Sequence, residues 1–168
     1  MVKQRIAHCF ILLSSFLFSC AAVFPPAWIH LGNGSDFPAT VGYFFFSGVC
    51  HQLPERSFHL WGEPLAVCAR CSGVYAGFLA GALLFPVIRR RLKREFPPAW
   101  VLGAAILPAA ADFGLARLGV HDSGNALRLI TGLIPGMAVS FFILPGVYEI
   151  VSGPSKPKGL TCRTNPAS

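Results

Sequence analysis

The sequence predicts an all-α integral membrane protein, a bundle of four transmembrane helices with a short re-entrant or interfacial helix. Of its 168 residues, 54% are apolar and only 12% are charged, whereas soluble domains average about 25% charged residues. The mean hydropathy is +0.58, which argues against a water-soluble globule and excludes a disordered chain. The apolar residues gather in four runs, each close to the length of about 20 residues that crosses a bilayer.

The first run covers residues 6–24, has no formal charge, and is followed by Pro25 and Pro26. A continuing helix tolerates such a pair poorly, so we expect the first span to end there. The second run covers residues 66–88 and is apolar apart from Arg70. It carries small residues that let membrane helices approach closely, namely Gly73, Ala76, Gly77, Ala80 and Gly81.

The third run covers residues 99–118, after a proline pair, and contains Asp112 as its only acid. The fourth covers residues 129–150 and carries Gly132 and Gly136 at GxxxG spacing. This spacing is used in dimers and also within single chains. We expect it to serve close helix packing within this chain.

Residues 37–50 form an apolar segment that is short for a span and long for a loop. This length is typical of a re-entrant or interfacial half-helix. If the segment did cross, the N-terminus would change sides, but everything after Cys50 would keep its side. Together the elements predict a transmembrane domain over residues 1–151, followed by a disordered tail over residues 152–168.

Basic residues predict the orientation, because Lys and Arg near span ends stay on the cytoplasmic side. They precede the first span, occupy residues 89–94, and follow the fourth span. Both termini are therefore expected in the cytoplasm, and residues 50–64 outside it, in the cell (inner) membrane. Lys3 and Arg5 before an apolar run also fit a cleaved secretion signal, but the run is long enough to span, so we expect it to be retained.

The net charge of +7 is explained by this topology and by attraction to anionic lipid, so nucleic acid is not an expected partner. The lipid bilayer is the expected environment, and the oligomeric state stays open. The sequence contains no phosphate-binding glycine loop with its lysine, no HExxH and no GxSxG. Hydrolase and nucleotide-driven pump functions therefore have no support.

Three of the six cysteines stand with a histidine in a pattern that can bind metal: Cys50 and His51 are adjacent, and Cys68 and Cys71 form a CxxC. Thiolates and an imidazole make a Cys3His set, which is a common zinc arrangement. Iron or an iron cofactor uses overlapping ligands. The sequence thus predicts an extracytoplasmic metal site with zinc as the first choice. Adjacent residues share one ion only if the helix ends there, which Pro54 favours.

Two other uses of these cysteines stay open, and with them the question of whether the protein is an enzyme. A disulfide from Cys50 to Cys68 or Cys71 would pin a scaffold that meets another membrane protein, since thiols outside the cytoplasm tend to oxidise. The arrangement is also similar to that of quinone-coupled disulfide-forming membrane enzymes, the vitamin K epoxide reductase and disulfide-bond-formation families, although those use two cysteine pairs. In such an enzyme the thiolate of Cys68 or Cys71 would be the attacking group and Cys50 the resolving cysteine. Arg70 would lower the pKa of the attacking thiol.

The predicted spans also contain charges. A carboxylate inside a span is expensive unless it is paired, and we expect Asp112 to pair with Arg128, which begins the fourth span from the same side. The pair either locks the bundle or, with Arg70, supports the cysteine site or an anionic ligand. Ser123 and Asn125 precede the fourth span and are good helix caps.

Two motifs carry a family resemblance. The first reads CHQLPERSF from Cys50, and the second reads CARCSGVYAG from Cys68. Over about residues 40–137 the chain resembles a family of predicted prokaryotic integral membrane proteins described as a domain of unknown function (DUF2085). The resemblance implies membership but no reaction. That family carries an Asp, an Asn and an Arg in its second half, and by the resemblance these cofactor-site candidates fall on Asp112, Asn125 and Arg128.

Overall fold

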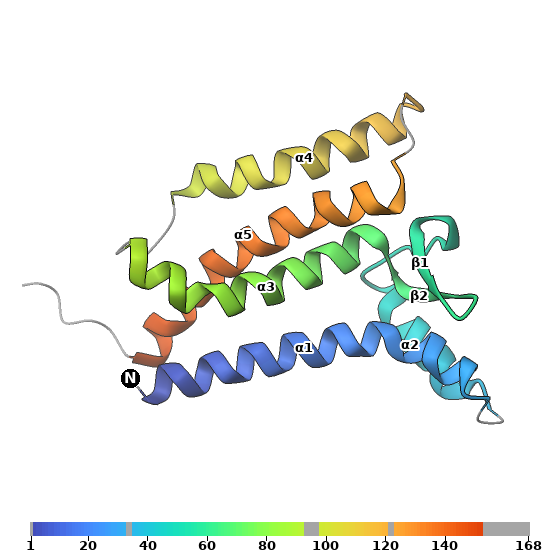
Figure 1. The fold of residues 1–168 in the computed structure, drawn as a ribbon, viewed down its shortest axis with the longest axis horizontal. Coiled ribbons are helices and arrows are strands. Elements are labelled where there is room, and N and C mark those ends of the chain that lie inside the picture. The colour runs from blue at the N-terminus through green and yellow to red at the C-terminus, as the bar shows by residue number, and fades with distance from the viewer. Residues whose placement is uncertain (1, 33–34, 93–97, 121–122, 153–168) are drawn as a thin grey trace, which may run out of the picture.

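The computed structural model describes residues 2–32, 35–92, 98–120 and 123–152. Four helices in this part are long and apolar enough to cross a membrane, and a shorter helix accompanies them (Figure 1). The predicted all-α membrane bundle is therefore confirmed. The elements in chain order are α1 (Val2–His30), α2 (Phe37–Ser47), the 3-10 turn η1 (Pro54–Arg56), β1 (Ser57–Leu60), β2 (Glu63–Cys68), α3 (Ala69–Leu92), α4 (Ala99–Arg117) and α5 (Asn125–Ser152).

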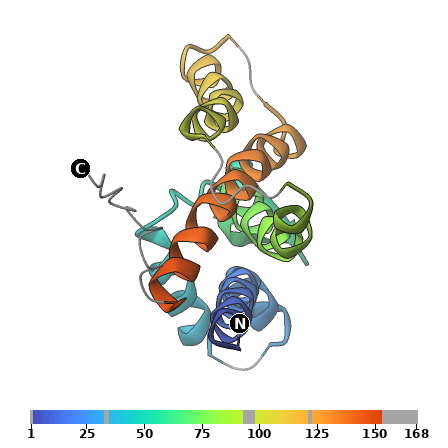
Figure 2. The same cartoon turned by 90° about the vertical axis from the view of Figure 1, so that its left-hand side faces the viewer.

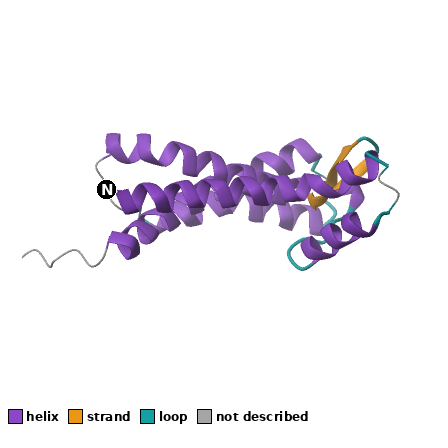
Figure 3. Ribbon diagram, turned by 90° about the horizontal axis from the view of Figure 1, so that it is seen from below, coloured by secondary structure: helices purple, strands orange, loops and turns teal. Residues whose placement is uncertain are grey.

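The helices α3 and α5 form the centre of the bundle, and α1 packs along one side of them. On the other side α4 packs mainly against α5, so the four long helices form a row with α4 at its outer end (Figure 2). The short helix and the hairpin of β1 and β2 lie together at one end of the long helices (Figure 3). The start of α1 and the ends of α3 and α5 lie at the other end (Figure 1).

Glycines bring α3 and α5 into direct backbone contact, which confirms that the GxxxG spacing serves packing within the chain. A Cβ atom added at any of four glycines would overlap a backbone carbonyl oxygen of the facing helix. Small residues at such positions let membrane helices gain van der Waals contact over a long interface. The pairs are Gly73 with Leu129, Gly77 with Leu133, Gly132 with Arg70, and Gly136 with Val74.

The first helix does not end at the proline pair, and this prediction is wrong. Although each proline costs the helix a hydrogen bond, α1 continues through Pro25 and Pro26 to His30. Both proline side chains are fully buried. A Cβ atom added at Gly42 of α2 would lie 2.6 Å from Cγ of Pro25, so the absence of a side chain at Gly42 makes room for the ring. Burial against α2 stabilises the helix where its own hydrogen bonding is interrupted.

The predicted short helix is present as α2, although it ends at Ser47 rather than at residue 50. Its 11 residues rise about 16 Å at 1.5 Å each, which is too short for about 30 Å of hydrocarbon. The second span begins at Ala69 rather than at residue 66, because the preceding residues belong to β2. The fourth begins four residues early, at Asn125. Apart from Ser152, the predicted tail lies outside the described residues.

The antiparallel hairpin of β1 and β2 was not predicted. Leu60 pairs with Glu63, so Trp61 and Gly62 form a two-residue turn. Both turn residues have positive φ, 54° and 91°, as a type I′ turn requires. A bulky residue rarely adopts this conformation, and Pro64 within the second strand further weakened the strand signal.

Candidate metal centre

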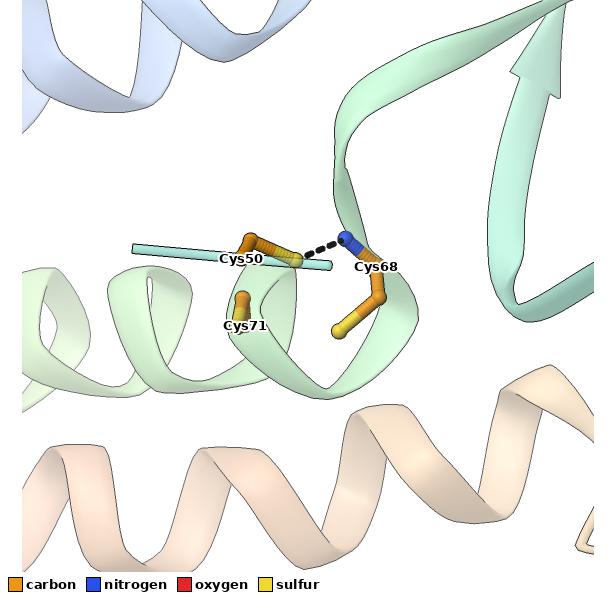
Figure 4. Close-up of side chains that lie close together, drawn as sticks. All are labelled: Cys50, Cys68 and Cys71. Carbon is orange, nitrogen blue, oxygen red and sulfur yellow. Dashed lines mark hydrogen bonds between the residues drawn. The ribbon is translucent and has the colours of Figure 1, made fainter. Parts of the chain in front are cut away.

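Three cysteines converge where the hairpin meets the helices. Cys50 follows α2, Cys68 ends β2, and Cys71 lies in the first turn of α3. Their sulfur atoms all lie within 4.8 Å of one another (Figure 4). Cys50 is buried, with 8% of its surface exposed, and the other two are half-buried. The CxxC spacing brings Cys68 and Cys71 together where β2 passes into α3, and the loop after α2 brings Cys50.

The predicted fourth ligand is not in place. His51 is exposed, and the convergent group among the described residues contains the three cysteines without it. Both residues lie in the loop between α2 and η1, where Cys50 is buried and His51 is exposed. Cys9 and Cys20 are exposed on α1 and do not join the group. The site is therefore a set of three sulfurs.

Hydrogen bonds favour the thiolate form of Cys50. Hydrogen bonds from the Cys68 and Cys71 side chains hold the pKa of the Cys50 thiol well below its usual range, although burial opposes the shift. The backbone N–H of Cys68 also donates to Sγ of Cys50 over 3.2 Å (Figure 4). Since the thiolate is both the nucleophile and the metal ligand, the cluster holds a sulfur prepared for either chemistry.

Gln52 fixes the backbone beside Cys50, a role that the sequence analysis missed. Its side-chain Nε2 donates to the carbonyl oxygens of Tyr43, over 2.8 Å, and Ala66, over 2.7 Å. These bonds join the end of α2 to β2. Gln52 has a φ of 50°, which is uncommon for a residue other than glycine. The CHQ motif could have pointed to this role, because Gln52 directly follows the candidate ligands Cys50 and His51.

Apolar side chains of α1, α2 and β2 pack against the cysteines. Phe46, Ala66 and Val67 are fully buried against Cys50. Phe18 of α1 contacts Tyr75 of α3 edge to face, with ring centroids 5.0 Å apart. These two rings also line a pocket of about 280 Å³ between α1 and α3. Apolar side chains thus cover one side of the sulfur cluster.

The predicted direct partner of Asp112 is corrected: the ion pair joins Asp112 to Arg70 rather than to Arg128, although the charge of Arg128 also acts on the carboxylate. The other carboxylate oxygen of Asp112 accepts a hydrogen bond from Oγ of Ser123. The carboxylate is nearly enclosed, with 6% of the side chain exposed, and the Arg70 side chain is 24% exposed. Arg70 and Arg128 approach the same depth from different helices, so depth alone did not identify the partner.

The two predicted helix caps instead link different elements. Ser123 bonds to Asp112 of α4, and Asn125 Nδ2 donates to the carbonyl oxygen of Ser57 in β1 over 3.0 Å. Asn125 Oδ1 accepts from Nη1 of the buried Arg128 over 3.3 Å. The predicted cofactor-site residues thus belong to two polar groups. Asn125 and Arg128 tie the hairpin to α5, and Asp112 with Arg70 ties α4 to α3.

Tyr43 provides a test of how the hairpin is held, since its hydroxyl donates to the carbonyl oxygen of Pro64 over 2.6 Å. Burial, and then the charge of Glu63, raise the pKa of Tyr43 above its usual value. The bond's contribution is therefore complete below about pH 10 and is lost as the pH rises through the folded-state pKa. We expect Tyr43→Phe to lower the free energy of unfolding by about 1 kcal/mol at neutral pH.

Thermal melts at neutral and alkaline pH would check this prediction. The wild type should lose stability above about pH 10, and the phenylalanine variant should lose less over the same interval. An equal loss in both proteins would show that the Tyr43 hydroxyl does not contribute.

Comparison with known proteins places these residues in a family. The family model described as "Predicted membrane protein (DUF2085)" matches residues 50–142. An uncharacterized protein of Methanocaldococcus jannaschii is 38% identical over 144 residues, covering 84% of this chain and 92% of that protein. An uncharacterized protein of Methanothermobacter thermautotrophicus is 35% identical over 100 residues, covering 56% of this chain and 84% of that protein. No solved structure matches the chain.

The matched segment begins at Cys50 and extends into α5. It therefore contains the three cysteines, the hairpin, and the polar network of Arg70 and Asp112. It also covers more than half of the chain. As the resemblance predicted, the chain belongs to the DUF2085 family of predicted membrane proteins.

Proposed function

We propose that this membrane protein binds one soft metal ion, with zinc as the first choice and iron as the alternative, through Cys50, Cys68 and Cys71. The observation that carries the proposal is the mutual approach of three sulfur atoms within 4.8 Å. Zinc–sulfur bonds of about 2.3 Å place the sulfurs of one tetrahedral ion about 3.8 Å apart. The described spacing accommodates an ion with small side-chain adjustments.

The surroundings of the sulfurs suit a negatively charged group. The cysteines lie at the start of α3, where the helix dipole favours anions such as thiolates.

Three protein ligands leave one coordination position for a water or an external ligand. Closed structural zinc sites have four protein ligands, whereas zinc sites with three protein ligands keep an exchangeable position. We therefore infer a site that exchanges its ion or its fourth ligand, rather than a closed structural staple. His51 is not needed for this set.

We further infer that the metal site lies on the extracytoplasmic side, with both termini in the cytoplasm. Arg5, Arg89 and Arg90 line one pocket at the opposite end of the bundle, and basic residues at span ends favour the cytoplasmic side. A fluorescent protein or an alkaline phosphatase fused after residue 152 tests the orientation. Fluorescence without phosphatase activity is expected, and the reverse would refute it.

Elemental analysis of untagged, detergent-purified protein tests the metal site. We expect about one equivalent of zinc or iron in the wild type, and loss of at least nine tenths of it in Cys50→Ser, Cys68→Ser and Cys71→Ser, since removing one of three ligands leaves two. His51→Ala and Cys20→Ser are matched controls and should keep the metal, because both residues are exposed outside the cluster. A metal-free wild type would refute the proposal.

Thiol–disulfide exchange with a lipid quinone is the second candidate function. It is favoured by the pocket between α1 and α3, whose aromatic wall includes Tyr75, one helical turn after Cys71. Two thiols would become a disulfide and release two protons and two electrons, which would reduce the quinone to a quinol. Alkylation mass spectrometry before and after addition of quinone should then show the loss of two free thiols. An unchanged thiol count would reject exchange, and a disulfide present throughout would indicate the structural staple.

A further inference from the structure

The end of the bundle opposite the cysteines contains a second concave site. A cavity of about 450 Å³ opens there between α1, α3 and α5. Its lining includes Arg5 of α1 and Arg89 and Arg90 of α3. No described lining residue is an aspartate or a glutamate, so three guanidinium groups share the cavity without a carboxylate from its wall.

Basic residues at the ends of membrane spans are expected from the orientation of the protein in the bilayer. That orientation does not account for the contacts that Arg89 makes with aromatic rings. Its guanidinium lies over the Tyr148 ring, 5.3 Å from the centroid, and 6.0 Å from that of Phe85. Tyr148 belongs to α5, so these contacts turn Arg89 across the cavity instead of out into water. Cation–π contacts of this kind orient a guanidinium while leaving its N–H groups able to donate.

The wall opposite α3 is also fixed by a polar contact. Oη of Tyr148 and Nδ1 of His8 lie 2.9 Å apart and form a hydrogen bond between α5 and α1. The seam between the same two helices carries an apolar groove of about 610 Å³, lined by Ile6, Phe10 and Val147 among others. The groove and the cavity are lined by neighbouring residues of the same two helices, Ala7 and His8 of α1 and Val147 and Tyr148 of α5.

We propose that this cavity binds the phosphate of an anionic phospholipid from the surrounding leaflet. Planar guanidinium groups recognise phosphate oxygens through paired hydrogen bonds. Basic pockets between transmembrane helices at this level are suited to phospholipid head groups. Phe85 and Pro86 in the cavity wall, and the apolar groove along the same two helices, favour a lipid over free phosphate. The site is independent of the cysteines and of any metal bound there.

Native mass spectrometry of the full-length, detergent-purified protein tests the lipid site, with phosphatidylglycerol and phosphatidylcholine as probes. We expect wild-type protein to retain phosphatidylglycerol over phosphatidylcholine, and Arg5→Gln with Arg89→Gln to weaken that retention at least tenfold, since each arginine contributes about fivefold. The control with the same charge change at the other end is Arg56→Gln with Arg117→Gln, which should bind as the wild type does.

A second variant protects the test against misfolding. Arg5 and Arg90 are both exposed, so Arg5→Gln with Arg90→Gln should fold normally, as a thermal melt would show, and should still lose at least about fivefold in retention. Equal binding of the two lipids would overturn the proposal. Equal weakening in the control variant would show that only net charge matters, which also overturns it. Complete displacement of the lipid by millimolar inorganic phosphate would assign the cavity to free phosphate instead.

Discussion

Isoleucine in place of Gly136 is expected to separate α3 from α5 and to lower the free energy of unfolding by about 3 kcal/mol or more. The added Cβ atom would overlap the carbonyl oxygen of Val74, which is a backbone atom and cannot turn aside as a side chain can. The two helices must therefore move apart along the whole interface of facing glycines. Thermal or denaturant unfolding in detergent measures the loss.

Gly146 offers a matched control on the same helix. Nothing lies within 4 Å of a Cβ atom added there, and replacing a helical glycine removes its intrinsic penalty of about 1 kcal/mol. Gly146→Ile should therefore be as stable as the wild type or slightly more stable. If Gly136→Ile also kept wild-type stability, the close approach of α3 and α5 would be disproved.

Asp112→Asn is expected to cost about 3 kcal/mol of folding free energy, because it leaves the Arg70 guanidinium without its ion-pair partner in a largely buried position. The amide keeps the shape of the carboxylate, and its oxygen can still accept from Ser123. The loss of folding free energy in this variant therefore measures the contribution of the negative charge of Asp112. Since α4 packs mainly against α5, this pair is also a main connection between α4 and α3.

The double variant Arg70→Gln with Asp112→Asn separates pairing from other effects. Removing both charges should recover at least half of the loss seen in the single variants, since neither partner is then left buried and uncompensated. Additive losses would mean that the two residues contribute separately. Retention of metal in Asp112→Asn would assign the pair a structural role, and loss of metal in a folded variant would place it in the function of the cysteine site.

Hydropathy predicted the four long helices because each span must bury its backbone polar groups within itself and face lipid with apolar side chains. The ends were harder to predict. Pro25 is a strong local stop signal, yet packing against Gly42 carries α1 past it. The hairpin was missed because its turn uses Trp61 and its second strand contains a proline, so the local preferences opposed the structure formed.

The cysteine site was partly predictable for a related reason. The CxxC spacing alone places Cys68 and Cys71 close together, and the loop length lets Cys50 reach them. Whether the His51 side chain reaches the three sulfurs depends on the path of the chain after α2. The spacing of residues in the sequence does not determine that path. The pairing of Arg70 with Asp112 similarly depends on side-chain reach between α3 and α4, which helix order and depth do not determine.

The two-stranded hairpin also fixes the depth of the protein in the bilayer. In the described sheet, each strand has a neighbour on only one side, and unpaired peptide groups cost several kcal/mol each in hydrocarbon. The hairpin must therefore lie where water reaches it. From Ala69, next to the hairpin, α3 rises about 30 Å to Arg89, which matches the thickness of the hydrocarbon core. The sulfurs next to it would then lie near the boundary between lipid and water, and a metal ion of the kind proposed would reach them from the aqueous phase without crossing the acyl chains.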